Sequence, residues 1–118
     1  MAIATNAQKE TLAIAYGAAG TYISCHVLTG PGTTGANEQP NTGSPAYARK
    51  ATTWTAGPSD GVNNGSQVTI DLPACTITWI GLWTAATGGT FLDGYQLGTS
   101  QTFASQGQLL VTPSFTQT

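Results

Sequence analysis

The chain contains the stretch Thr76-Ile77-Thr78-Trp79-Ile80-Gly81-Leu82-Trp83-Thr84, which is its most apolar segment. β-Branched and aromatic residues dominate it, and these residue types are enriched in strands. Apolar side chains occupy both sets of alternate positions, so both faces of a strand would be buried. The stretch is much shorter than the about 20 residues of a membrane-spanning helix. It therefore predicts a central strand of a β-sheet.

Further strand signals flank this stretch at a spacing of about ten residues, with turn-forming residues between them. In residues 22–29, Ile23, Cys25 and Val27 occupy alternate positions, which predicts a half-buried strand. The pattern as a whole predicts a mainly β fold, a single antiparallel β-sandwich or barrel of about six to eight strands with one short N-terminal helix. The other expected strands are residues 47–55, 67–72, 90–97, 101–103 and 108–115.

Glycine, proline and asparagine mark the expected connections between strands. Residues 30–45 predict a long loop, and loops of this length usually have a role or become ordered by a partner. A second loop is expected at residues 57–65, with Asn63-Asn64-Gly65 as a turn. Shorter turns are expected at Asp60-Gly61, Ala85–Gly89, Asp93-Gly94 and Gly107.

The one helix is expected near the N-terminus, at Lys9–Ala19. Thr5 or Asn6 can cap it, and Gln8 follows Thr5 at the spacing of a capping box. Its short, Ala-rich sequence predicts that it leans on the sheet and covers an open end or edge. Candidate stop residues are Gly17 and Gly20. The core-facing stripe is expected from Leu12, Ala15, Tyr16 and Ala19.

The chain length of 118 residues allows one domain and is too short for two. We expect residues 1–118 to form a single β-sandwich domain, with the N-terminal segment and helix in residues 1–20 and the strands in residues 21–118. Only 7% of the residues are charged, against about 25% in typical soluble domains. Uncharged polar surfaces form hydrogen bonds without ionic desolvation, which suits a permanent assembly. A secreted β-domain is the alternative interpretation of this composition.

The charge balance also excludes some partners. Three basic residues are too few for nucleic-acid binding, which needs clustered Lys and Arg side chains. The dipeptide Arg49-Lys50 is interpreted as a solvated strand end. Met1–Asn6 lack the basic and apolar regions of a secretory signal. We therefore expect cytoplasmic synthesis or a mature chain, and neither a nucleic-acid nor a membrane partner.

The sequence offers no arrangement typical of catalysis. His26 is the only histidine, and we expect it on the surface or held by a hydrogen bond. Strand alternation places Cys25 on the opposite face from His26, so the two cannot act as nucleophile and base. Cys25 and Cys75 lack the spacing of a zinc site. We expect both to be free thiols, with a single disulfide between them as the alternative.

Metal and cofactor sites are not expected either. The carboxylates occur singly, and a calcium site at Asn37 and Glu38 would have too few acidic ligands. The Gly-rich loops lack the arrangement that holds phosphate. We therefore predict a protein that is not an enzyme, with no catalytic, cofactor-binding or metal-ligating residue. The aromatic side chains are expected in the core rather than on a sugar-binding face: Trp54, Trp79, Trp83, Tyr95 and Phe103.

Residues 12–110 carry a family resemblance in an ordered series of motifs. The chain resembles small structural proteins of tailed bacteriophages, of the minor tail or tail-fibre type, particularly those of actinobacterial phages. Where many such proteins read Ser-Leu-His-Thr, this chain has Ser24-Cys25-His26-Val27, and no Asp precedes Pro31. These departures affect the loop rather than the framework. The motifs are Tyr22–His26, Pro31–Glu38, Gly43–Lys50, Val68–Pro73, Thr78–Trp83 and Thr84–Leu92.

The resemblance implies a structural component of the virion, made and assembled in the host cytoplasm, with no cofactor. The leading hypothesis is a minor tail protein near the tip or fibres that associates with other virion proteins and with copies of itself. Contact with a host surface glycan would then involve the loop at residues 30–45 and aromatic side chains. One alternative is a capsid decoration protein whose residues 1–6 reach a neighbouring subunit. A carbohydrate-binding module is the third reading.

Overall fold

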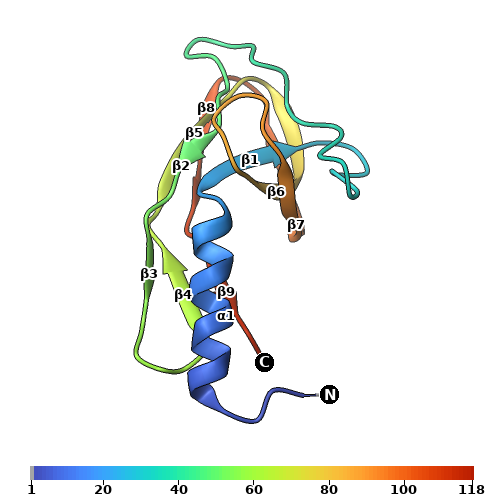
Figure 1. The fold of residues 1–118 in the computed structure, drawn as a ribbon. Coiled ribbons are helices and arrows are strands. Elements are labelled where there is room, and N and C mark those ends of the chain that lie inside the picture. Colours follow the sequence, from blue (N-terminus) through green and yellow to red (C-terminus); the bar gives the residue numbers. More distant parts are fainter. Residues whose placement is uncertain (1) are drawn as a thin grey trace.

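The computed structural model describes residues 2–118, which contain one helix and nine strands (Figure 1). The fold is mainly β with antiparallel sheets and one short N-terminal helix, as predicted. The elements are α1 (Asn6–Ala19), β1 (Tyr22–His26), β2 (Lys50–Ala51), β3 (Trp54–Ala56), β4 (Val62–Gly65), β5 (Val68–Leu72), β6 (Cys75–Trp83), β7 (Phe91–Phe103), β8 (Gly107–Val111) and β9 (Ser114–Thr116).

The nine strands exceed the expected number because two expected strands are each divided in two and one expected loop contains a strand. Residues 47–55 contain two short strands, β2 and β3, and residues 108–115 contain parts of β8 and β9. Residues 62–65 form the additional strand β4. In the opposite direction, the two expected strands between residues 90 and 103 are one long strand, β7.

The strands form three antiparallel sheets. The four-stranded sheet has the order β2-β1-β6-β7, so β6 is a central strand as its sequence predicts. A three-stranded sheet has the order β3-β4-β9, and a two-stranded sheet pairs β5 with β8. No ladder joins β7 to β8 within residues 2–118, so the sheets do not close into a barrel.

The hydrophobic core lies between the four-stranded sheet and the β5–β8 pair. β1 is buried on both faces and not half-buried as expected, because Ser24, Cys25 and His26 are all fully covered. The segment after β1 folds back over the His26 face, where Ala36 and Glu38 contact His26. The core residues are Ile23, Cys25, Tyr47, Val68, Ile70, Leu72, Ile77, Ile80 and Leu82.

Helix α1 lies beside the three-stranded sheet, where it contacts β3, β4 and β9 (Figure 1). The side-chain oxygen of Thr5 caps it by accepting the Gln8 N–H, as predicted. The expected core-facing stripe is correct for Tyr16, which packs against the core, and wrong for Leu12, Ala15 and Ala19, which are exposed. The buried residues of the helix are Glu10, Ala13 and Gly17. Ala13 and Gly17 are small, which brings the helix close to β4.

Two expected turns are strands instead. Asn63-Asn64-Gly65 pairs with β3 in the register that sets Asn63 opposite Ala56, and the Asn63 side chain donates to the Ala13 carbonyl of α1 at 2.9 Å. This long-range contact outweighs the local turn preference. Asp93-Gly94 lies inside β7. Asp60 and Gly61 form the expected bend before β4.

Candidate functional site: an open groove beside a buried polar network

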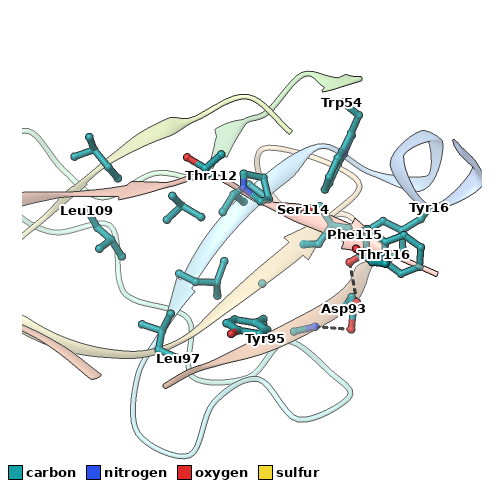
Figure 2. Close-up of a pocket in the computed structure, with 18 of the residues that line it drawn as sticks. Tyr16, Trp54, Asp93, Tyr95, Leu97, Leu109, Thr112, Ser114, Phe115 and Thr116 are labelled. Carbon is teal, nitrogen blue, oxygen red and sulfur yellow. Dashed lines mark hydrogen bonds between the residues drawn. The ribbon is translucent and has the colours of Figure 1, made fainter. Parts of the chain in front are cut away.

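A groove of about 690 Å³ lies between β7 and the β8–β9 segment, where the sheets do not close. Its floor includes Ile23 of β1 and Ile80 and Leu82 of β6, which belong to the core. Figure 2 shows Leu97 and Leu109 toward one end of the groove and Tyr16, Asp93 and Phe115 at the other. The core is thus covered on this side by half-buried side chains rather than by a further strand.

Three aromatic side chains and one carboxylate close the groove at the α1 end (Figure 2). The ring of Tyr16 stacks on Phe115 with centroids 3.9 Å apart and meets Trp54 edge-on at 5.9 Å. Its hydroxyl donates to the Asp93 carboxylate at 2.7 Å. Burial raises the pKa of Tyr16, and the hydrogen bond and negative charge of Asp93 raise it further. Tyr16 is therefore a neutral donor that holds α1 against β7.

Both long sides of the groove are strand edges. β7 pairs with β6 along one edge only, and β8 pairs with β5 along one edge only. Such edges present unpaired N–H and C=O groups and are usually protected by Lys, Pro or shortness. β7 is 13 residues long, without Lys, Arg or Pro, and its single charge belongs to Asp93. The groove therefore suits an uncharged, extended segment.

A network of polar side chains lies under the loop at residues 30–45. His26 Nδ1 lies 2.8 Å from the Ala36 carbonyl, so this nitrogen must carry a proton to donate. Nε2 of the neutral ring then accepts from the Ser24 hydroxyl at 2.7 Å, and the Trp83 indole N–H donates to Ser24 at 3.0 Å. Burial lowers the pKa of His26, although the Ala36 bond and the Glu38 charge oppose this shift.

An ion pair completes this network. Arg49 contacts both Glu38 carboxylate oxygens, at 2.9 and 2.8 Å, and its guanidinium lies 3.7 Å from the centre of a Trp83 ring. The Tyr47 hydroxyl donates to the same carboxylate at 2.8 Å. Burial alone would raise the pKa of Glu38, but the hydrogen bonds and charge of Arg49 and the bond from Tyr47 lower it overall.

The ion pair corrects one interpretation of the sequence. Arg49 is not a solvated strand end, because its side chain is only 8% exposed. The Glu38 carboxylate is bound within the chain by Arg49 and Tyr47. A usable signal was present in the sequence: Glu38 and Arg49 are the only charged residues between Glu10 and Lys50, which favours pairing between them.

The network positions the loop, and its central Ser24 and His26 side chains are inaccessible to solvent. Ser24 and His26 adjoin as a nucleophile and base would, but both side chains are fully buried. Arg49 also donates to the carbonyls of Ala85 and Gly88, which joins two loops. The loop at residues 30–45 is therefore held by contacts within the chain, rather than awaiting a partner to order it.

The remaining candidate residues divide between core and surface. Cys25 and Cys75 are free thiols, and burial raises the pKa of both. Tyr95 is 68% exposed at the groove and is not a core residue as expected.

In residues 2–118 no three His, Cys, Asp or Glu side chains gather as metal ligands, and no helix is long and apolar enough to cross a membrane. Of the five aromatic residues expected in the core, the four besides Tyr95 are buried or half-buried: Trp54, Trp79, Trp83 and Phe103.

A family model described as podophage GP4 fiber I protein gp80 matches residues 6–116, nearly the whole chain. The chain belongs to this family. No curated protein and no solved structure matches it. Membership of the fiber I gp80 family makes the chain a structural phage fibre protein, a virion component that associates with other virion proteins. The tail-fibre resemblance is thereby confirmed, whereas the link to actinobacterial phages stays a prediction.

Proposed function

We propose that this chain is a non-enzymatic minor tail protein, located at the tail tip or fibres and built into the virion through its uncharged surfaces. The observation that carries the proposal is the open groove. The family match to a phage fibre protein supports it, because a fibre protein has neighbours that can cover such a groove. An isolated soluble domain gains nothing from half-covered core residues and two unpaired strand edges. A subunit of a permanent assembly has neighbours to cover both.

The groove supplies a binding mode as well as a surface. An extended segment of a neighbouring protein can pair with the β7 edge, and its alternate side chains can enter the apolar groove. Leu97, Leu109 and Val111 would contact these side chains. Asp93 would not oppose binding of an uncharged segment, since its carboxylate already accepts from Tyr16 and from the Gly94 N–H.

The shape of the molecule favours self-association as well. Its radius of gyration is 14.9 Å, against about 13.5 Å for a compact domain of this length. Its accessible surface is 6416 Å², against about 6000 Å² for a monomer of this mass. We propose that several copies assemble as a homo-oligomer and thereby cover part of this additional surface.

A contact with a host glycan is a second part of the proposal, and one observation supports it. Tyr95 presents an exposed ring beside the groove, and exposed aromatic rings suit stacking on sugars. Replacement of Tyr95 by Ala tests it: binding of the chain to purified host cell-wall glycan should fall at least tenfold. Binding that is absent from the unmodified chain, or unchanged in the variant, would remove this element and leave the structural role intact.

Immunogold electron microscopy of intact virions tests the location. Antibodies against the chain should label the tail end of the particle. Label distributed over the head would instead support the capsid decoration role. Absence of label from virions, with label on the denatured protein as the positive control, would contradict the whole proposal.

A further inference from the structure

The outward face of α1 lacks the charged residues that a solvent-facing helix normally carries. This face consists of Thr11, Leu12, Ile14, Ala15, Ala18 and Ala19, all of them exposed. Leu12 and Ile14, the two largest aliphatic side chains of the helix, are 37% and 51% exposed. Amphipathic surface helices place such side chains toward the core and charged ones toward water.

The charged residues of α1 have the reverse placement. Glu10 is only 8% exposed, and its carboxylate accepts the Gly61 N–H at 3.1 Å. Lys9 is half-buried. Toward its own chain the helix buries Ala13 and Gly17 and packs the ring of Tyr16 on Phe115 and Trp54. Leu12 and Ile14 take no part in these contacts and remain exposed.

The apolar surface continues beyond the helix. Ile14 and Ala18 border a hollow of about 320 Å³ between α1 and β3, which is also lined by Trp54 and Ala56. Asn63 lines the same hollow, and its buried Oδ1 atom has no hydrogen-bond partner among residues 2–118. This unpartnered acceptor is a second sign that the surface is incomplete in the single chain.

We propose that the outward face of α1 packs against the same helix of a second copy of this chain. The inference rests on the proposed role as a fibre subunit that assembles with itself. Identical faces without charge can meet around a symmetry axis with no repulsion. Ala15, Ala18 and Ala19 permit a close approach of the two helix backbones, while Leu12 and Ile14 flank the contact. A membrane surface is a poorer occupant, because helices that bind lipid carry Lys and Arg beside their apolar face.

The substitution Ala15→Glu tests the contact, because it places a charge in the centre of the face and leaves the intrachain contacts of α1 unchanged. Analytical ultracentrifugation should show an oligomer for the unmodified chain and the monomer mass of 12.0 kDa for the variant. Thr33→Glu, at an exposed loop position, is the control and should remain oligomeric. Circular dichroism establishes that both variants are folded.

A mixing experiment identifies the occupant of the face. The variants Ala15→Glu and Ala15→Lys should each be monomeric, and an equimolar mixture should recover the oligomer, since the opposite charges then meet. A mixture that stays monomeric would overturn the proposal, and so would an Ala15→Glu chain that stays oligomeric. An unmodified chain that is monomeric at about 50 μM would also overturn it, because a contact within a fibre should form at this concentration.

Cross-linking gives a measurement that does not depend on disruption. In a chain with Cys75→Ser, the further substitution Ala15→Cys should yield a disulfide-linked dimer on mild oxidation, whereas Thr33→Cys should not. Equal dimer yields from both positions would contradict the assigned face. All these results concern the purified chain, so they are independent of where immunogold label is found on the virion.

Discussion

The Glu38–Arg49 pair is the contact on which the placement of the long loop most depends. Arg49 joins Glu38 to the carbonyls of Ala85 and Gly88 and covers Trp83. Removing one partner of a largely buried pair leaves the other without compensation. The substitution Arg49→Met should therefore lower the free energy of unfolding by about 3 kcal/mol, measured by urea denaturation.

The adjacent basic residue provides the control for this prediction. Lys50 is half-buried on β2, and the one ion pair in residues 2–118 does not include it. Lys50→Met should change the unfolding free energy by less than about 0.5 kcal/mol. Equal losses for the two variants would show that Arg49 acts as a general strand residue and not through the network.

The pH dependence of stability should report the state of His26. Its pKa in the folded chain lies below the ordinary value of 6.5, mainly through burial. The unfolded chain therefore binds a proton at His26 more readily than the folded chain does. The contribution of His26 to the free energy of unfolding is fully present above pH 6.5 and is lost as the pH decreases toward the folded pKa. The Glu38 pKa is also lowered, so its contribution is lost below 4.5, the ordinary value.

Thermal unfolding between pH 8 and pH 4 measures both effects. The unmodified chain should lose several degrees of melting temperature between pH 7 and pH 5. His26→Asn retains a donor for the Ala36 carbonyl and should give a nearly flat profile in that interval. A slope that persists in this variant would assign the acid sensitivity to another group.

At this scale the sequence predicts local chemistry and misses long-range contacts. Thr5 caps α1 as expected, because the cap depends on the next three residues alone. The burial of Arg49 could not be inferred from its neighbours. Its partners are 11 residues away at Glu38 and 36 residues away at Ala85, and only the tertiary fold brings them together.

Among the elements, the contact between α1 and β4 explains why Ala13 and Gly17 face the sheet. Gly17 lies inside the helix, where Ala would normally add stability. A Cβ atom at this position would overlap the Asn63 side chain and lie 2.9 Å from the Trp54 side chain. Gly17→Ala should therefore lower the unfolding free energy by about 1–3 kcal/mol, the usual effect of overpacking.

A second glycine makes the test specific. Gly98 of β7 has open space where a Cβ would be placed, so Gly98→Ala should be nearly neutral. Chemical denaturation of both variants decides the matter. A stabilised Gly17→Ala chain would mean that α1 does not approach β4 as closely as described.

A substitution in the groove between β7 and β8 should affect assembly and leave the fold unchanged. Leu110 lines this groove and is exposed in the single chain. Leu110→Glu should alter the unfolding free energy by less than about 0.5 kcal/mol but reduce incorporation into virions at least fivefold, as measured by immunoblot of purified particles. Leu28→Glu, at an exposed leucine outside the groove, should be incorporated normally. Normal incorporation of both variants would exclude the groove as an assembly site.

For the whole molecule, the β-rich class and the central position of β6 were predictable, whereas the open groove was not. Class follows from residue alternation and turn chemistry, which are local. Whether β7 and β8 pair depends on the splay of two strands that are adjacent in sequence. The low charge content nevertheless predicts a surface that contacts other subunits. The face of α1 and the edge of β7 are two such surfaces with few or no charged residues.

A minor tail protein must be present in the particle in a small number of copies. Its copy number per purified virion, measured against the major capsid protein by quantitative mass spectrometry, tests that claim. We predict on the order of ten copies, as the rotational symmetry of a tail implies. Hundreds of copies would place the protein on the head lattice, and absence from the particle would contradict a structural role in the virion altogether.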